Sequence, residues 1–270
     1  MQMCFNGATS MKEDLFTDVV SVAQAGFKYL EIWKAKLYDA LQKTPIYEIK
    51  EFFRKHGVEP ITINSLEDAT LAENREEKFR ECEEMCKLVK EMEASILIVV
   101  PSFLAFPMSE KQVVRESVDV MKEISRIAAK WGVKIGFEFL GFKSCSVNNL
   151  SLAWRIVQEV SAENVGLVID TFHFFVGGSD LQELRKIPLE KIYMIHINDL
   201  PRIVAREPRD EDRIMPGDGV LPLKDFFSIL KEIEYDGPVS IELFNAKYWK
   251  WNPGKLASLS YEKMLKFVEG

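Results

Sequence analysis

Short runs of apolar and β-branched residues alternate with longer amphipathic stretches from one end of the chain to the other. This alternation is typical of repeated β-α units around a parallel sheet. We expect eight strands, at residues 3–6, 29–33, 60–64, 96–101, 134–140, 165–169, 192–197 and 239–243. We expect helices between them, at residues 12–25, 47–55, 75–92, 110–131, 150–160, 222–234 and 261–268. Because eight parallel strands can close on themselves, the pattern predicts an α/β fold, a single (β/α)8 TIM barrel.

The chain length suits one such barrel. Its 270 residues, 47% of them hydrophobic, can bury a large core, and no Pro/Gly/Ser-rich linker or step in composition interrupts them. We therefore expect one domain over residues 1–270. Glycines before several expected strands predict left-handed helix ends at Gly26, Gly57, Gly132 and Gly237. The longest irregular segment, residues 200–221, follows the seventh expected strand, and a loop of that length is usually functional.

Composition argues against several classes of partner. No apolar run approaches the roughly 20 residues that a membrane span needs, and the first residues lack the basic and apolar regions of a signal peptide. We expect a soluble, cytoplasmic protein that binds no membrane. Lys and Arg number 35 against 42 Asp and Glu, for a net charge of -7, so a nucleic acid is a poor partner. Of the four cysteines, only Cys82 and Cys86 lie close in sequence, four residues apart in an expected helix. We expect these two to pack in the core and not to bind a metal, because no second Cys or His pair follows at zinc-site spacing.

Four expected strands carry a metal-binding side chain at or near their carboxyl ends. They are the fifth to the eighth strands, and their side chains are Glu138, Asp170, His196 and Glu242. In a (β/α)8 barrel the reacting groups come from these strand ends and the loops that follow. Any one of the four could instead cap a strand end or pair with an arginine.

A divalent metal explains the four residues together. A carboxylate in a buried strand costs several kcal/mol without compensation, and three carboxylates converging on one imidazole would repel one another without a cation. The set is hard and rich in oxygen, so it suits one Mn2+, Mg2+ or Co2+ ion and also tolerates Zn2+.

Other polar residues are expected near the same end of the barrel. His173 follows Asp170 by three residues and could bind a substrate oxygen or pack against Phe172 and Phe174. Arg213, in the long loop, could donate to substrate oxygens or form a surface ion pair with a nearby aspartate.

Three further residues have open roles. Asp199 could orient the His196 imidazole or reach the metal through water. Glu31 and Asn64, in the second and third expected strands, could line the substrate pocket or only satisfy strand ends. His56 precedes Gly57 at a helix end and is expected on the opposite side of the barrel.

Four segments give the chain a resemblance to a known family. They are residues 4–9 (Cys-Phe-Asn-Gly-Ala-Thr), 164–174 (around Asp-Thr-Phe-His), 210–219 (Arg-x-x-Pro-Gly-x-Gly within it) and 240–244 (Ser-Ile-Glu-Leu-Phe). The chain resembles the xylose isomerase-like barrel superfamily of sugar isomerases and epimerases, and within it the inosose isomerase branch of myo-inositol catabolism. The likeness covers nearly the whole chain.

The resemblance implies a metal held by Glu138, Asp170, His196 and Glu242, with His173 and Arg213 contacting a polyhydroxylated ketone. It implies that the metal binds the carbonyl and adjacent hydroxyl oxygens and stabilises a cis-enediolate, while Glu138 and Glu242 act as catalytic acid and base. The expected reaction is isomerisation of a keto-inositol such as 2-keto-myo-inositol (inosose). The alternative is a ketose 3-epimerase of the D-tagatose/D-psicose type.

The sequence disfavours two other classes of protein. An endonuclease IV-like apurinic endonuclease of the same superfamily binds three metal ions with many histidines. This chain has only three histidines, which argues against that class. A barrel that only binds a sugar would have lost a metal ligand or an acid/base residue, and none is lost here. The expected partner is thus a small sugar or inositol ketone, and a homo-oligomer is common among such barrels.

Overall fold

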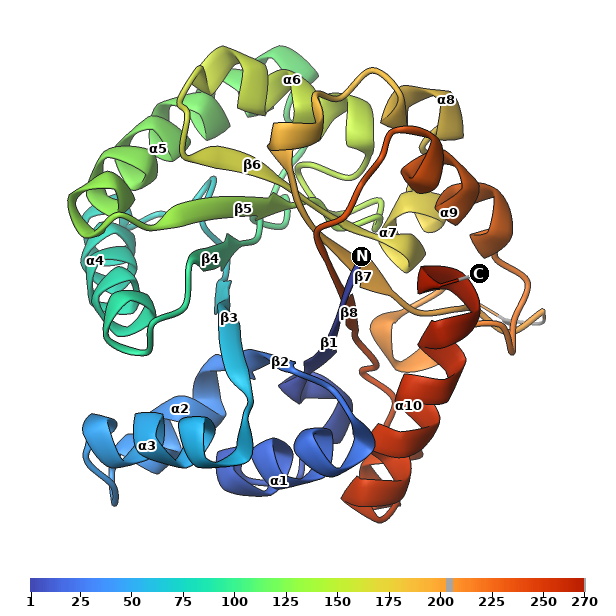
Figure 1. The fold of residues 1–270 in the computed structure, drawn as a ribbon. Coiled ribbons are helices and arrows are strands. Elements are labelled where there is room, and N and C mark those ends of the chain that lie inside the picture. The colour runs from blue at the N-terminus through green and yellow to red at the C-terminus, as the bar shows by residue number, and fades with distance from the viewer. Residues whose placement is uncertain (203–205, 270) are drawn as a thin grey trace. The chain divides into compact units, whose positions relative to one another are not determined.

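A computed structural model of the chain describes residues 1–202 and 206–269. The described strands are β1 (Gln2–Asn6), β2 (Tyr29–Trp33), β3 (Glu59–Leu66), β4 (Ile96–Val99), β5 (Lys134–Glu138), β6 (Val165–Asp170), β7 (Ile192–Ile197) and β8 (Pro238–Ile241). They follow one another in chain order in a closed parallel barrel (Figure 1). The predicted (β/α)8 fold is confirmed.

The described helices are α1 (Leu15–Ala25), α2 (Lys34–Leu41), α3 (Ile46–His56), α4 (Arg75–Glu91), α5 (Glu110–Trp131), α6 (Leu150–Val160), α7 (Thr171–Val176), α8 (Leu181–Leu184), α9 (Leu223–Glu232) and α10 (Pro253–Val268). Short 3-10 turns lie at Gly7–Ser10, Leu189–Lys191, Asp210–Asp212 and Tyr248–Lys250. None of the helices in the described ranges has the length and hydropathy that crossing a membrane requires.

The chain clusters into two compact units. Unit 1 comprises Met1–Thr62 and Ile195–Gly270, and unit 2 comprises Ile63–Met194. The prediction of one domain over the whole chain stays a prediction.

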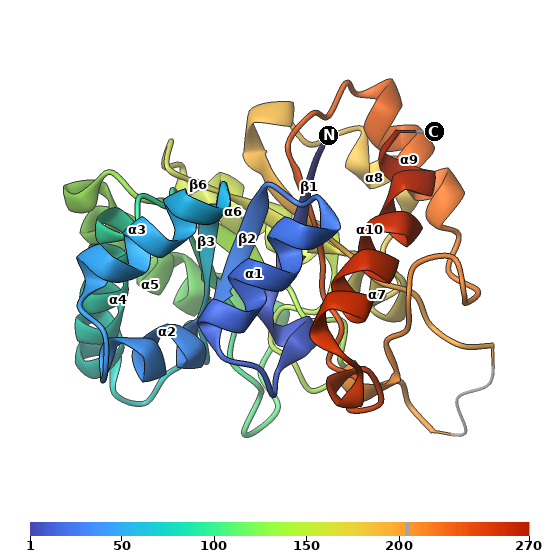
Figure 2. The same ribbon diagram turned by 60° about the horizontal axis from the view of Figure 1, so that its bottom comes forward.

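In unit 1, β1 pairs with both β2 and β8, and β7 pairs with β8. Helices α1 and α10 lie side by side (Figure 2), and Phe27, just after α1, packs edge-on against Tyr261 of α10 with ring centroids 5.1 Å apart. Asn252 caps the first turn of α10 and Pro253 occupies its first position. These two residues begin the helix well before the predicted start at Tyr261, as proline and asparagine commonly do.

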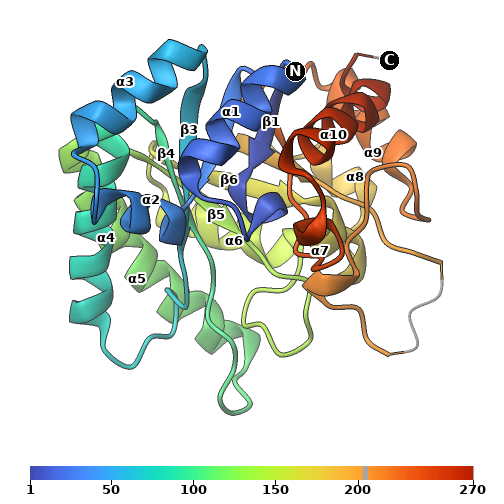
Figure 3. The same ribbon diagram turned by 90° about the horizontal axis from the view of Figure 1, so that it is seen from below.

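In unit 2, β5 pairs with β4 on one side and β6 on the other. Helices α4 and α5 lie next to each other (Figure 3), and Ser109 and Gln112 form a capping box at the start of α5. All six residues of β6 are buried, which agrees with a strand whose two faces both meet apolar side chains.

Left-handed helix ends are confirmed at Gly26, Gly57 and Gly132, with φ of 97°, 66° and 69°. The prediction for Gly237 is wrong, because the left-handed residue after α9 is Glu234, with φ of 59°. The helix therefore ends before the glycine is reached. A Cβ at Gly237 would lie 2.7 Å from the ring of Tyr235, so the glycine makes room for that ring.

Candidate functional site

Two of the four predicted metal donors come from neighbouring strands of unit 1. His196 lies in β7, and Glu242 directly follows the last residue of β8. His196 is opposite Ser240 in the parallel register, and the Glu242 N–H donates to the Ile197 carbonyl at 3.3 Å. The register thus places a buried imidazole beside a buried carboxylate at the carboxyl ends of β7 and β8.

Both oxygens of the Glu242 carboxylate have hydrogen-bond donors. Asn6 Nδ2 donates to Oε1 at 2.9 Å, and Arg213 donates to Oε2 at 2.5 Å. His196 Nδ1 lies 3.3 Å from Oε2. Burial alone would raise the pKa of Glu242, but the nearby His196 and Arg213 outweigh it and hold that pKa well below its usual range. Glu242 is therefore ionised at neutral pH.

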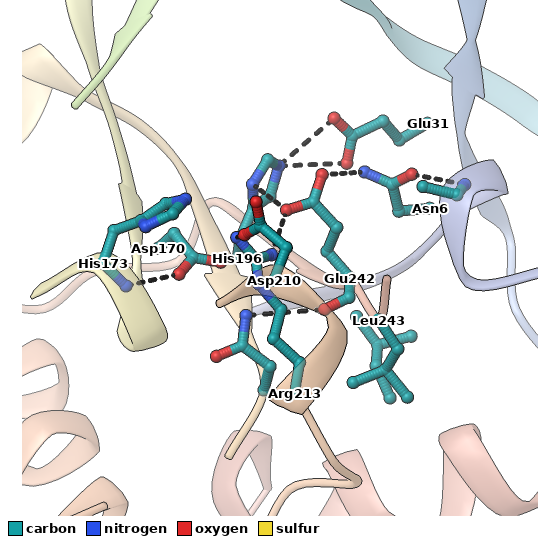
Figure 4. A network of polar contacts seen from close by, with 12 residues as sticks. Asn6, Glu31, Asp170, His173, His196, Asp210, Arg213, Glu242 and Leu243 are labelled. Carbon is teal, nitrogen blue, oxygen red and sulfur yellow. Dashed lines mark hydrogen bonds and ion pairs between the residues drawn. The ribbon is translucent and has the colours of Figure 1, made fainter. Parts of the chain in front are cut away.

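The other edge of the His196 ring faces Glu31. Nε2 lies 3.2 Å and 3.1 Å from the two oxygens of this carboxylate, which belongs to β2 and is completely buried (Figure 4). The two ring nitrogens thus face two different carboxylates. The predicted contact of Glu31 with substrate stays a prediction.

The other two predicted donors end neighbouring strands of unit 2. Glu138 is the last residue of β5, and Asp170 is the last residue of β6; both are buried. Glu138 is opposite Val168, so Asp170 lies two residues further on, with its side chain on the same face of β6 as that of Val168. Asp170 also caps α7, because its Oδ1 accepts a hydrogen bond from His173 N at 2.8 Å (Figure 4).

Glu138, Asp170, His196 and Glu242 form a group that could hold a metal ion, since one ligand atom of each lies within 4.8 Å of the others. Three buried carboxylates that come together would repel one another when ionised, and a cation between them would offset that repulsion. The donors are mostly oxygen and the set is small, which fits one divalent cation. Their role as metal ligands stays a prediction.

Two of the predicted substrate contacts belong to unit 2, and both are buried. The ring of His173, in α7, packs edge-on against Phe142 and Phe172, with centroids 5.1 Å and 5.3 Å away. The aromatic packing weighed as an alternative for His173 is therefore real. Asn64 lies in β3. For both residues the contact with substrate stays a prediction.

Arg213 is 1% exposed, so the ion pair with a nearby aspartate that was its alternative role is present, but with a buried guanidinium. Besides Glu242, its guanidinium donates to Asp210 Oδ1 at 2.7 Å, across the 3-10 turn that precedes it. Asn245 Nδ2 donates to the Arg213 carbonyl at 2.9 Å and holds the backbone of this residue. The loop thus presents a fixed guanidinium to the Glu242 carboxylate.

The expected contact of Asp199 with the His196 imidazole is wrong, and its expected link to the metal through water stays a prediction. Its carboxylate accepts hydrogen bonds from four backbone N–H groups, at distances of 2.8 to 3.0 Å. The donors are Leu200, Gly217, Gly219 and Leu221. Asp199 therefore holds the two ends of the long loop together. The loop's residues 203–205 lie outside the described residues.

Asn6 is the site residue that the sequence analysis did not single out. It ends β1, opposite Glu31, and its Oδ1 accepts from Ala8 N at 2.8 Å while its Nδ2 reaches Glu242. The rule that found the metal donors, a polar residue closing an apolar run, would also have selected it.

Acidic and imidazole side chains at the carboxyl ends of parallel strands are the donor set of metal-dependent (β/α)8-barrel enzymes. The chain belongs to the Xylose isomerase-like TIM barrel family, which it matches over residues 19–266. It is 34% identical to an inosose isomerase of Halalkalibacterium halodurans and 35% identical to one of Bacillus subtilis, each over 93% of this chain and about nine-tenths of the relative (90% and 91%). A crystal structure of the IOLI protein with a bound zinc atom superposes with a TM-score of 0.95 at 32% identity, covering 100% of this chain and 98% of the other.

Proposed function

We propose that this protein is a divalent-metal-dependent isomerase of inosose, a cyclic polyhydroxylated ketone. The observation that carries the proposal is the convergence of Glu138, Asp170, His196 and Glu242 on a volume that one ion could occupy. The similarity to curated inosose isomerases over nearly the whole chain supports the substrate class. We propose these four side chains as the metal ligands.

When bound, the ion would supply a positive charge that polarises the ketone and makes the proton on the adjacent carbon easier to remove. We assign proton transfer to Glu138 and Glu242. Asn6 and Arg213 fix the orientation of the Glu242 carboxylate. Glu138 comes from β5 and supplies the second carboxyl group, which an isomerase needs to return the proton at the neighbouring carbon.

We assign substrate hydroxyl and carbonyl contacts to His173, Arg213 and Asn64. Their polar atoms come from α7, the long loop and β3, and all three side chains are buried, so each is held in a defined orientation. Hydrogen-bonding groups fixed in this way select a polyol over an apolar ketone, because an apolar ketone would leave them unpaired. The four cysteines are buried and unlinked, which supports placing the enzyme in the reducing cytoplasm.

The test is NMR in D2O with 2-keto-myo-inositol and, separately, ketohexoses, using enzyme loaded with Zn2+ or Mn2+ and enzyme treated with EDTA. We expect deuterium uptake and conversion of the keto-inositol only with metal. Conversion of ketohexoses alone would replace the proposal with a ketose 3-epimerase. Absence of any exchange by the metal-loaded enzyme would contradict the isomerase mechanism.

A matched pair of variants tests the proton-transfer role. Glu138→Gln should lower the rate about 10²–10⁴-fold, the usual contribution of an acid/base residue, with metal content measured alongside. Glu67→Gln changes an exposed glutamate of the same unit and should leave the rate unchanged. Equal rates for the two variants, with metal bound in both, would remove Glu138 from the mechanism.

A further inference from the structure

Glu31 is a buried carboxylate whose position needs a physical explanation. It lies in the middle of β2 between the buried apolar residues Leu30 and Ile32, and its own side chain is 0% exposed. An ionised carboxyl group in such surroundings costs several kcal/mol unless hydrogen bonds compensate it. Its Oε1 is hydrogen-bonded to His196 Nε2 at 3.2 Å, and its Oε2, which has no hydrogen-bond partner among the described residues, lies 3.1 Å from the same nitrogen (Figure 4).

The His196 ring has a different neighbour on each side. Nε2 faces Glu31, which is not among the proposed metal ligands, whereas Nδ1 faces Glu242 Oε2, which is. A neutral imidazole has one N–H and one lone pair. If Nε2 carries the hydrogen and donates it to Glu31, the lone pair of Nδ1 points toward the proposed metal ligand Glu242.

We infer that Glu31 is a positioning residue that holds His196 in the Nε2–H tautomer and makes Nδ1 the metal-binding nitrogen. Histidines that bind metals generally donate their other ring N–H to a carboxylate or carbonyl, which fixes the ring and strengthens the ligand. The inference rests on the metal site of the proposed function and is independent of the substrate.

The neighbouring strand β1 orients Glu242, the second proposed ligand in unit 1. Asn6 is opposite Glu31 in the β1/β2 register and donates to Glu242 Oε1. Because Ala8 N donates to Asn6 Oδ1, the amide is oriented with its NH2 group toward Glu242. The paired ends of β1 and β2 therefore each orient one ligand, Glu242 through Asn6 and His196 through Glu31.

The first test leaves Glu31 and His196 unchanged. Long-range ¹H–¹⁵N NMR spectra of protein with ¹⁵N-labelled histidine report which ring nitrogen carries hydrogen. The chain has three histidines, so spectra of the variants His56→Gln and His173→Gln identify the signals of His196. We expect His196 to carry its hydrogen on Nε2 with and without Zn2+, and Zn2+ to shift the Nδ1 signal. A hydrogen on Nδ1 with Zn2+ on Nε2 would overturn the inference.

The second test measures Zn2+ affinity by competition with a chromophoric chelator. We expect Glu31→Ala to weaken binding about 10–100-fold, as is usual for loss of such a partner, and Glu31→Gln to weaken it less because its amide oxygen can still accept the N–H. Glu59→Gln, at the exposed start of β3, is the control and should bind as the wild type does. Affinity within twofold of wild type for Glu31→Ala would refute the positioning role.

Kinetics separate this role from direct contact with substrate. If Glu31 instead binds substrate, Glu31→Gln will raise KM while its Zn2+ affinity equals that of the wild type, and the inference is then wrong. Neither the NMR nor the affinity test uses substrate. Failure to convert inosose by an enzyme that passes both tests would overturn the proposed function and leave the role of Glu31 standing.

Discussion

Asp18 of α1 and Lys36 of α2 form an ion pair that is almost completely buried. Lys36 Nζ lies 2.6 Å from Asp18 Oδ2 and 2.9 Å from the Ser10 carbonyl, and the Ser10 hydroxyl donates to Asp18 Oδ1 at 2.6 Å. Burial raises the pKa of Asp18 from 3.8 to about 7, because the loss of water outweighs the attraction of Lys36. Burial also lowers the pKa of Lys36. The pair joins the first two helices of the chain at a cost that depends on pH.

Replacing Lys36 by Met should destabilise the protein more at pH 8 than at pH 5. The folded state of the wild type binds more protons at Asp18 than the unfolded state does between pH 3.8 and about 7, so this group makes stability fall as pH rises through that window. Without Lys36 the pKa of Asp18 rises further, so the fall in stability continues above pH 7, where that of the wild type levels off. Between pH 7 and pH 8 the variant should therefore lose about 1.4 kcal/mol that the wild type does not lose. Urea unfolding at both pH values measures the difference.

The control for this prediction is the double variant Asp18→Asn with Lys36→Met, which removes both charges. The free energy of unfolding of the double variant, relative to that of the wild type, should not fall between pH 5 and pH 8 as it does for the single variant. A Lys36→Met variant equally destabilised at pH 5 and pH 8 would show that packing, and not charge, accounts for its loss of stability.

At the scale of elements, the long loop after β7 depends on one side chain. Asp199 accepts four backbone hydrogen bonds from the start and the end of the loop, and a Cβ at Gly219 would lie 2.3 Å from its Oδ1. The glycine is needed because the backbone approaches the carboxylate so closely. This arrangement supports the loop that carries Arg213 to Glu242.

Asp199→Ala should therefore destabilise the folded conformation of the long loop. Leaving backbone donors without their acceptor costs roughly 1–3 kcal/mol, and the amides of Gly217, Gly219 and Leu221 should exchange faster in hydrogen exchange measurements. The neighbouring exposed Asp218, which pairs with Lys263, provides the control Asp218→Asn. Unchanged exchange of these three amides in Asp199→Ala would contradict the anchoring role.

Sequence patterns predicted the elements that repeat and missed those that depend on a local contact. The strands and long helices follow from periodic apolar residues, and the four proposed metal ligands follow from polar residues in buried strands. Helix α7 was missed because Thr171–Val176 is almost entirely apolar and shows no helical period; its start depends on the Asp170 cap. The hydrogen-bond partners of Glu31 and Asp199 could not be predicted. The alternation of residues along a strand indicates on which face of the sheet a side chain lies, but not which groups it contacts there.

At the scale of the whole molecule, two strands link the compact units covalently. β3 contributes Glu59–Thr62 to unit 1 and Ile63–Leu66 to unit 2, and β7 is divided between Met194 and Ile195. Neither unit can unfold without losing half of each of these strands. We therefore propose that residues 1–270 unfold as one domain.

Tryptophan fluorescence can follow each unit separately, because Trp131 and Trp154 belong to unit 2 and the other three tryptophans to unit 1. Replacing one set or the other by Phe should give thermal transitions that coincide with each other and with far-UV circular dichroism, as two-state unfolding requires. Zn2+ at about 1,000 times its Kd should stabilise the folded state by about 4 kcal/mol and raise both transitions together by roughly 10 °C, and EDTA should reverse the shift. The two units supply two proposed ligands each, so the metal should stabilise both. Separate thermal transitions would mean that the two units unfold independently. A Zn2+ shift confined to one set of tryptophans would mean that the metal is held by fewer than the four proposed residues.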